Sequence, residues 1–228
     1  GADILTVLYF NQMNINEKEP NAKVRDRFVL SKGHCSPALY STLARKGYFE
    51  KERLLTFRNI ESNLQGHPDM NKVPGVDMTS GSLGQGLSVA NGMALASKLN
   101  GDGYRVYCLL GDGEIEEGQV WEAAMTSNKY KLDNLCVIVD NNNLQIDGKI
   151  EEVKGLTNIG DKFKSFGFEV LQIDGNNIEE LLNAFNVAKT IKGKGVSFME
   201  NKVEWHGRAP KEEEYKQAIE ELSKKYAM

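Results

Sequence analysis

Residues 106–113 of the chain read Val-Tyr-Cys-Leu-Leu-Gly-Asp-Gly, an apolar run that ends on an aspartate between two glycines. A second apolar run, at residues 135–139, ends on the Asp-Asn-Asn-Asn of residues 140–143. Short apolar runs closed by turn residues predict buried strands, and a helical pattern at residues 121–130 separates these two. A strand, a helix and a strand in this order form a unit with parallel strands. We therefore predict an α/β fold, with an open, mainly parallel sheet sandwiched by helices.

Both runs end on side chains that carry oxygen atoms. The carboxyl ends of parallel strands lie at one edge of a sheet, where open α/β folds bind their ligands. Asp112 offers an anionic oxygen, Asn142 offers an amide oxygen thirty positions later, and a carbonyl near Leu144 could complete the set. Hard oxygen ligands with little charge suit Mg²⁺ that keeps positions open for phosphate oxygens. Gly113 leaves room for a phosphate, and we expect its N–H to face a phosphate oxygen. The pairing predicts a Mg-diphosphate site, although each cluster taken singly is more often a plain turn.

A glycine cluster, Gly-Ser-Leu-Gly-Gln-Gly at residues 81–86, opens a helix of small residues. Its glycine spacing is not that of the dinucleotide-binding fingerprint. Its N–H groups could face an anion or lie against a planar ring. The glycines could equally serve close packing of the helix.

The three histidines, His34, His67 and His206, all stand beside glycine in irregular segments. A lone histidine is more often structural than catalytic. Loops carry functional residues disproportionately, so three such histidines favour a functional role. A basic turn, Lys-Thr-Ile-Lys-Gly-Lys-Gly at residues 189–195, could contact a phosphate, but taken alone it is better read as a solvated turn.

Composition excludes several classes of function. The net charge of −4 and the absence of a basic block argue against nucleic acid as a partner. The longest apolar runs are about five residues, against the ~20 that a membrane helix requires, and no signal-peptide pattern opens the chain. Cys35, Cys108 and Cys136 show no metal-binding spacing and are interpreted as reduced thiols, which favours a cytoplasmic protein without a zinc site.

The rest of the pattern predicts further elements on both sides of the central unit. They are helices at residues 2–14, 37–44, 51–58, 159–165 and 178–186, a charged helix from Lys211, and strands at residues 27–30, 105–110 and 169–173. No linker rich in Pro, Gly or Ser divides the chain, so we predict a single domain over residues 1–228. Gly1 is not an initiator residue and a helix already begins beside it, so we expect a further segment upstream.

The interval from Asp112 to Asn142 suggests thiamine diphosphate, and the wider set of motifs resembles the transketolase family. The matching motifs occur in the family's order and cover nearly the whole chain: SKGH at residues 31–34, GHP at 66–68, GSLGQG at 81–86, GDG at 111–113 and WHG at 205–207. The chain resembles in particular the amino-terminal, diphosphate-binding subunit of a split transketolase. The resemblance implies transfer of a two-carbon ketol unit from a ketose phosphate to an aldose phosphate, as in the pentose phosphate pathway.

The resemblance also implies roles for single residues. The metal, Mg²⁺ or in its place Ca²⁺ or Mn²⁺, would be held by Asp112, Asn142 and the Leu144 carbonyl. Thiamine diphosphate would be bound by residues from several segments: His34, Gly81, Ser82, Leu83, Gly113, Glu117, Asn142, Lys192 and His206. His67 would face the hydroxyl groups of the sugar donor and assist proton transfer, with His34 and His206 close by. Glu117 resembles the acidic residue at a subunit contact that couples two cofactor sites, although its neighbours Glu114 and Glu116 could be mistaken for it.

The chain departs from the family pattern in three places. The family's first substrate histidine would lie upstream of Gly1. A stretch that includes a hydrophobic strand is missing near Asn186, and we expect residues to be absent from the sequence there, which weakens the assignment of Lys192. Too few residues follow Pro210 for the pyrimidine-binding domain, whose glutamate activates the cofactor. We therefore expect the chain to be inactive alone and to work as two copies with two copies of a pyrimidine-domain subunit.

Three alternatives stay open. The first is a sibling thiamine enzyme, either deoxyxylulose-phosphate synthase or the alpha subunit of a 2-oxoacid dehydrogenase, against which the three histidines argue. The second is a non-catalytic assembly subunit, against which the intact Asp112, Gly113 and Asn142 argue. The third is a Mg-dependent phosphatase with Asp112 as nucleophile, a chemistry that usually requires a second aspartate nearby.

Overall fold

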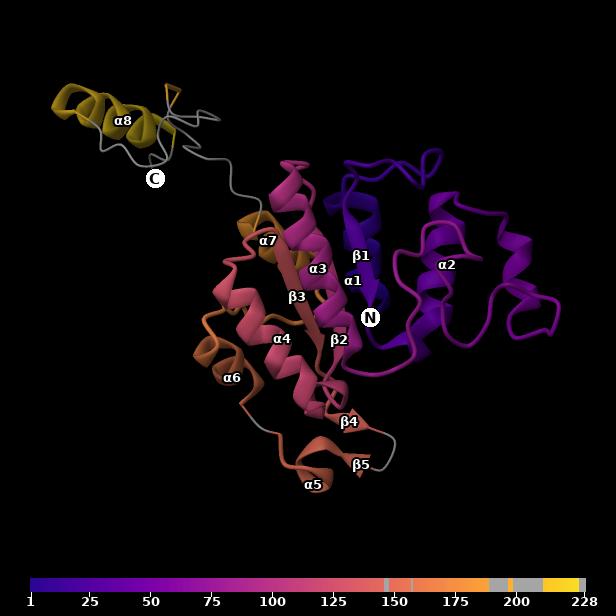
Figure 1. The fold of residues 1–228 in the computed structure, drawn as a ribbon. Coiled ribbons are helices and arrows are strands. Elements are labelled where there is room, and N and C mark those ends of the chain that lie inside the picture. The colour runs from indigo at the N-terminus through magenta and orange to yellow at the C-terminus, as the bar shows by residue number, and fades with distance from the viewer. Residues whose placement is uncertain (146–147, 157, 189–196, 199–210, 226–228) are drawn as a thin grey trace. The chain divides into compact units, whose positions relative to one another are not determined.

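The computed structural model of the protein describes residues 1–145, 148–156, 158–188, 197–198 and 211–225. The chain falls into two compact units, Gly1–Leu182 and Asn183–Met228, and each is described by itself. The first unit holds the sheet and the elements around it (Figure 1). The two units do not test the prediction that residues 1–228 form a single domain, which therefore stays a prediction.

Three parallel strands form the sheet of the first unit, in the order β1 (Arg27–Leu30), β2 (Val106–Gly111), β3 (Leu135–Asp140). The register pairs Gly111 of β2 with Asp140 of β3, so both strands end at the same edge. Strand β2 is buried along its whole length, which explains why its sequence is a continuous apolar run. The strand–helix–strand unit and its parallel pairing are confirmed.

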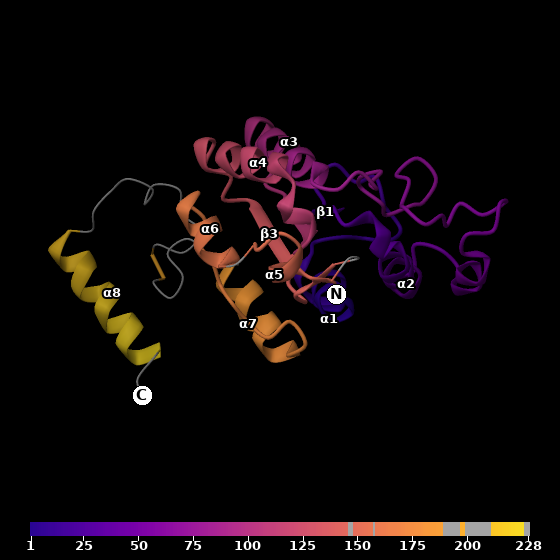
Figure 2. The same cartoon turned by 90° about the horizontal axis from the view of Figure 1, so that it is seen from below.

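Helices cover both faces of this sheet, as Figure 2 shows from below. Helices α3 (Gln85–Asn100) and α4 (Gly118–Lys129) pack on one face and share a buried core with β2. Ala90 and Ala94, one helical turn apart on α3, are both fully buried, and small side chains there let the helix lie close to the sheet. Helix α1 (Ala2–Val7) continues as a π-helical turn to Gln12 on the other face.

Shorter elements surround this layer structure. They are α2 (Ser36–Lys46), the 3₁₀ turns Gly33–Cys35, Lys51–Thr56 and Glu114–Glu116, the hairpin β4 (Leu144–Gln145) and β5 (Gly148–Lys149), and helices α5 (Ile150–Val153) and α6 (Ile159–Ser165). Helix α2 ends at Gly47, whose φ of 100° is the left-handed conformation that favours glycine at a helix end. The short helix expected at residues 51–58 is a 3₁₀ helix, and it ends at Thr56.

Residues 169–173, expected to be a strand, do not form one. Val170 packs against the core beside α4, while Leu171 and Ile173 are 52% and 40% exposed. A strand needs a neighbouring strand to exchange backbone hydrogen bonds, and no described strand pairs with this segment. The apolar residues of this segment are therefore not sufficient to make it a strand.

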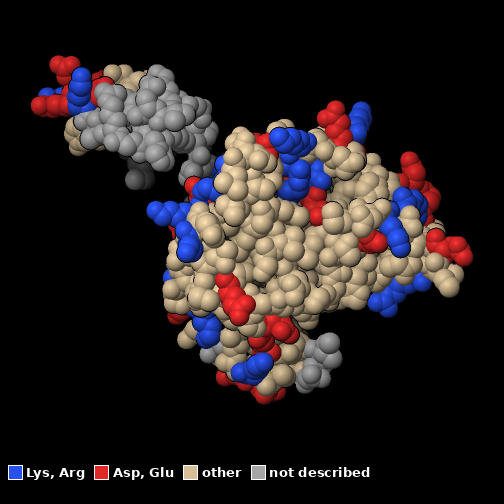
Figure 3. Space-filling model, viewed as in Figure 1, with Lys and Arg blue, Asp and Glu red and all other residues tan. Residues whose placement is uncertain are grey.

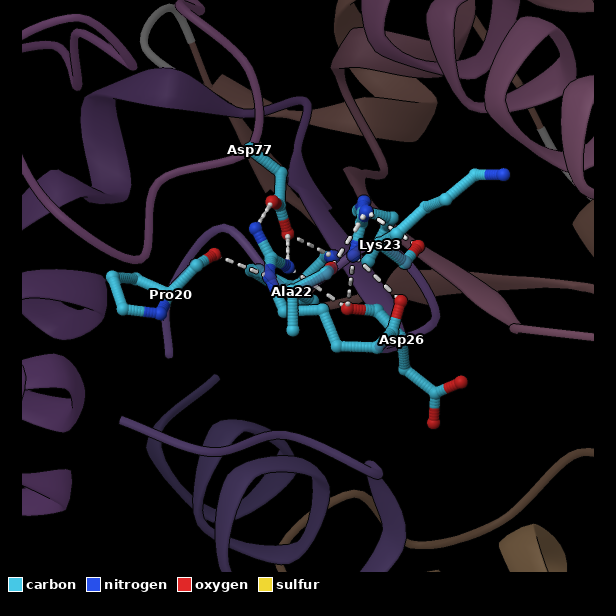
Figure 4. Close-up of polar contacts among 8 residues, drawn as sticks. Pro20, Ala22, Lys23, Asp26 and Asp77 are labelled. Carbon is cyan, nitrogen blue, oxygen red and sulfur yellow. Dashed lines mark hydrogen bonds and ion pairs between the residues drawn. The ribbon is translucent and has the colours of Figure 1, made fainter. Parts of the chain in front are cut away.

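A buried ion pair ties the segment before α3 to the start of β1. The guanidinium group of Arg25 contacts both carboxylate oxygens of Asp77, and it also donates to the carbonyls of Pro20 (2.5 Å) and Asp26 (2.9 Å). Asp77 in addition accepts the N–H of Phe28 at 2.8 Å. Figure 4 shows Asp77 directed toward this cluster. The ion pair of Arg25 and Asp77 therefore fixes the segment that precedes the glycine cluster to the start of β1.

Helix α7 (Ile178–Ala188) crosses the boundary between the two units, and α8 (Glu212–Lys225) lies in the second. Both confirm predicted helices. Among the described helices, none combines the length and apolar character that a membrane span requires. On the face of the first unit seen in Figure 3, lysine and arginine side chains are interspersed with acidic ones, and no large area carries a single sign of charge.

Candidate functional site

Four segments meet at the carboxyl edge of the sheet. Three of them follow the strands, at residues 31–34, 112–114 and 141–144, and the fourth is the glycine cluster at residues 81–86 that opens α3. The hydrogen bonds described below join each of these segments to at least one other. The parallel order of the strands predicted that the segments at residues 112–114 and 141–144 would meet, and the structure adds the other two.

Asp112 joins the segment after β2 to the segment after β3. Its side chain is buried, and Oδ2 accepts the N–H groups of Asn142 at 2.8 Å and Asn143 at 2.6 Å. Oδ1 accepts the N–H of Gly113 at 3.0 Å. A carboxylate oxygen can accept two hydrogen bonds, so Oδ1 keeps one acceptor position for a further partner.

Of the other two predicted metal ligands, Asn142 lies directly beside Asp112, and Leu144 lies beside Asn142. The amide Oδ1 of Asn142 accepts the N–H of Leu144 at 2.9 Å, and both residues are exposed to solvent. Among the described residues, no group of three or more His, Cys, Asp or Glu side chains gathers around one point. One carboxylate, one amide and one carbonyl fit a hard cation that takes its remaining ligands from a diphosphate and water.

The side chain of Gln145 lies close to Gly113 and favours a glycine there, whether or not a ligand binds. A side chain at this position would bring its Cβ within 3.0 Å of Cβ of Gln145, which is tighter than side chains normally approach. The N–H of Gly113, expected to face a phosphate oxygen, here donates to Asp112. The glycine therefore packs two loops together at the point where the predicted diphosphate would lie.

Lys32 and Asp140 form a close ion pair at the same edge. The Lys32 ammonium group lies 2.6 Å from Oδ2 of Asp140, and the Lys32 side chain is only 7% exposed. Burial raises the pKa of Asp140, but the hydrogen bond and positive charge of Lys32, together with the amino group of Gly1, outweigh this, so the pKa lies below its ordinary value. Neither residue of this pair was predicted from the sequence to have a role in the site.

His67 and Gly33, the neighbour of His34, both lie against the start of the glycine cluster. A Cβ at Gly81 would lie 3.3 Å from two ring atoms of His67, so the imidazole ring lies against the Gly81 backbone. Burial lowers the pKa of His34, and the positive charges of Lys32 and His67 lower it further, against an opposing effect of Glu114. The structure thus gathers two of the three predicted histidines. His206 and Lys192 lie outside the described residues.

Hydrogen bonds to backbone carbonyls fix the loop that carries His67. The hydroxyl of Tyr40 donates to the carbonyls of Gln65 at 3.0 Å and His67 at 3.3 Å, and the hydroxyl of Ser36 donates to Gly66 at 2.8 Å. Tyr40 and Ser36 both belong to α2 and are both buried. The loop is therefore held by a regular helix, which gives His67 a defined position.

The glycine cluster divides into an exposed part and a packed part. Ser82 and Leu83 are exposed at the start of the cluster. Gly84 and Gly86 are buried, and their N–H groups donate to Glu114 at 2.9 Å and to Ser31 at 3.1 Å. For these two glycines the structure favours close packing over an open anion site.

The three glutamates after Gly113 have different environments. Glu114 is buried, Glu116 accepts the side-chain N–H of Gln145 at 3.1 Å, and Glu117 is exposed at the start of α4. A role at a subunit contact requires an exposed side chain. The exposure of the three side chains therefore favours Glu117 for a subunit contact, a distinction that the sequence alone could not make.

Comparisons with known proteins agree with this geometry. The family model "Transketolase, thiamine diphosphate binding domain" matches residues 1–225. An apulose-4-phosphate transketolase subunit of Phocaeicola vulgatus is 43% identical over 235 residues, which cover 98% of this chain and 83% of that protein. The 6-deoxy-6-sulfo-D-fructose transketolase subunit SqwG of Clostridium sp. is 45% identical, covering 99% of this chain and 86% of that protein.

A solved structure shows the same fold within a longer chain. The transketolase from Campylobacter jejuni matches with a TM-score of 0.77 and 36% identity, over 96% of this chain and 37% of that one. Human transketolase is 41% identical over 97% of this chain and 37% of its own length. The chain thus spans most of the two relatives that are named as subunits but little more than a third of these longer transketolases.

Proposed function

The chain belongs to the transketolase family, in the part that binds thiamine diphosphate, and from this membership we propose that it is one subunit of a two-subunit transketolase. The proposed reaction moves a two-carbon ketol unit from a ketose phosphate to an aldose phosphate. One structural observation supports the proposed transketolase function in addition to the family match. Asp112 joins the loops after β2 and β3 and sets Asn142 beside it, at the sheet edge where His34 and His67 also lie.

We propose that Asp112, Asn142 and the Leu144 carbonyl hold the divalent metal, with Mg²⁺ as the natural choice for a diphosphate. The open acceptor position on Oδ1 of Asp112 supports this, because Oδ2 is already occupied by two N–H groups. The bound cofactor supplies a nucleophilic carbon and an electron sink for the bond that breaks. The chain's own task at this point is to anchor and orient the diphosphate end.

Proton transfer is assigned to the histidines. A lowered pKa keeps the His34 imidazole neutral near pH 7, and a neutral imidazole can accept a proton from a sugar hydroxyl group. His67, held against Gly81, would orient the hydroxyl groups of the donor sugar. The same family pattern assigns cofactor contacts to Gly81, Ser82 and Leu83, and also to Lys192 and His206, which lie outside the described residues.

The second subunit is proposed to carry the pyrimidine-binding domain, in an assembly of two copies of each chain. Relatives that match along most of their length are themselves named as transketolase subunits, which implies a partner chain in those proteins. Glu117, exposed at the start of α4 and next to Gly84, is the residue proposed to reach that partner.

A ketol-transfer assay tests the proposal. The chain is assayed with thiamine diphosphate, Mg²⁺, xylulose 5-phosphate and ribose 5-phosphate, first alone and then mixed with the pyrimidine-domain subunit. We expect transfer in the mixture only. A mixture that assembles but decarboxylates pyruvate instead of transferring ketol units would assign the chain to a sibling thiamine enzyme.

A further inference from the structure

Glu114 is a buried carboxylate at the centre of the site, and nothing above assigns it a task. Its side chain is 3% exposed. Oε2 accepts the N–H of Gly111 at 2.9 Å, and Oε1 accepts the N–H of Gly84 at 2.9 Å and the hydroxyl of Ser31. Burying a charge is costly unless it is compensated, and three donors converging on one carboxylate provide that compensation.

The three donors belong to three different segments of the sheet edge. Ser31 follows β1, Gly84 precedes α3, and Gly111 ends β2. The hydroxyl of Ser31 also accepts the N–H of Gly86 at 3.1 Å. Glu114 and Ser31 therefore hold the first turn of α3 against the ends of two strands.

The glycines around this carboxylate leave no space for side chains. At Gly84, an added Cβ would lie 2.8 Å from Cβ of Glu117, and the φ of +83° already favours glycine. At Gly86, an added Cβ would clash with both the side chain and the backbone of Ser31. The loops around Glu114 are thus closely packed. A shift of one loop against another would break the hydrogen bonds of Glu114.

The start of a helix normally attracts an anion from outside, because its free N–H groups carry partial positive charge. At α3 the internal anion Glu114 takes this position. The exposed Ser82 and Leu83, and Gly81 with His67 against it, therefore directly precede a backbone segment that Glu114 holds in place. On its other side, Glu114 directly follows Asp112 and Gly113, so its anchoring to Gly111 also fixes the turn that carries them.

We propose that Glu114 is a positioning residue for the cofactor site, acting through residues 81–83 and through Asp112 and Gly113. It touches neither cofactor nor substrate, since both carboxylate oxygens are engaged inside the protein. The inference rests on the proposed function, because it concerns how well this chain binds thiamine diphosphate.

The test compares cofactor affinity in the assembled complex with the pyrimidine-domain subunit. Glu114→Gln keeps the size of the side chain but turns an NH₂ group toward backbone N–H donors. We expect the dissociation constant of thiamine diphosphate, measured by calorimetric titration with Mg²⁺, to rise about tenfold or more, and kcat at saturating cofactor to stay within about threefold. Glu114→Asp, which keeps the charge, should recover part of the affinity.

Glu122→Gln on α4 is the matched control, because Glu122 is exposed and the chemical change is the same. It should bind cofactor as the unchanged chain does. Ser31→Ala removes one donor of the junction and should weaken cofactor binding by a smaller factor. This variant serves if Glu114→Gln does not fold.

Wild-type cofactor affinity in both Glu114→Gln and Ser31→Ala would overturn the inference. A loss of kcat at unchanged affinity would also overturn it, since that would mean a direct chemical role. If the unchanged complex itself binds no thiamine diphosphate, the proposed function fails and not this inference alone.

Discussion

Asp112 performs two tasks with different oxygens of one carboxylate. Oδ2 joins two loops through Asn142 and Asn143, and Oδ1 keeps an acceptor position that a metal can use. We predict that Asp112→Ala lowers ketol transfer by the complex at least about a hundredfold and lowers the free energy of unfolding by about 1–3 kcal/mol, because the N–H groups of Gly113, Asn142 and Asn143 lose their acceptor. Mg²⁺ dependence of activity and urea unfolding measure the two effects. Full activity at unchanged Mg²⁺ dependence would remove Asp112 from the metal site.

The pKa of His34 provides a second prediction for a single residue. Burial lowers it from its ordinary value of 6.5, and the cation of Lys32 adds to this effect. The folded state then binds fewer protons than the unfolded chain just below pH 6.5, so the contribution of His34 to stability falls as the pH drops through that range. An NMR titration should place the His34 midpoint below 6.5, and Lys32→Met should raise the midpoint. A midpoint at or above 6.5, unmoved by Lys32→Met, would contradict this account.

Sequence spacing predicted the residues that meet at the sheet edge better than it predicted their partners. Asp112 and Asn142 were identifiable because each follows an apolar run, and parallel strands bring such positions to one edge. The ion pair of Lys32 with Asp140 joins residues more than a hundred positions apart, and no local pattern announces it. The run of glutamates after Gly113 likewise does not reveal that Glu114 alone is buried.

At the scale of elements, the pair of Arg25 and Asp77 holds the segment before α3 against β1. Both side chains are nearly excluded from solvent, at 11% and 5% exposure. Removing one partner leaves an uncompensated buried charge, so Arg25→Met should lower the free energy of unfolding by about 3–5 kcal/mol. The double variant Arg25→Met, Asp77→Asn should recover part of this loss, and urea unfolding measures both. A loss below about 1 kcal/mol for the single variant would show that water or another cation replaces Arg25.

The elements themselves were predictable where local pattern and tertiary packing agree. Strand β1 and helix α6 were predicted at their observed bounds, because each contains its own apolar pattern and turn residues. Residues 169–173 are likewise mostly apolar, but a strand also requires a partner along its edge. That requirement is a property of the assembled sheet, so a local pattern cannot show whether it is met.

At the scale of the whole molecule, Glu117 is where this chain is proposed to meet its partner. It is exposed at the first turn of α4, it lies against the buried Gly84, and no described cation pairs with it. Because exposed side chains contribute little to folding, Glu117→Ala should change the free energy of unfolding of the isolated chain by less than about 0.5 kcal/mol. In the complex, losing a charge that becomes buried at the contact should weaken assembly with the pyrimidine-domain subunit by about tenfold or more.

Sedimentation of the mixed subunits measures this assembly, and Glu122→Ala on the same helix is the matched control, which should assemble normally. Equal assembly of the Glu117→Ala and Glu122→Ala variants would move the subunit contact away from the start of α4. Weakened assembly of Glu117→Ala alone would place the contact beside Gly84, so that the partner would bear on the same loop that Glu114 holds from inside. Binding of the partner and binding of the cofactor would then be coupled through one backbone segment, and each should strengthen the other to the same extent.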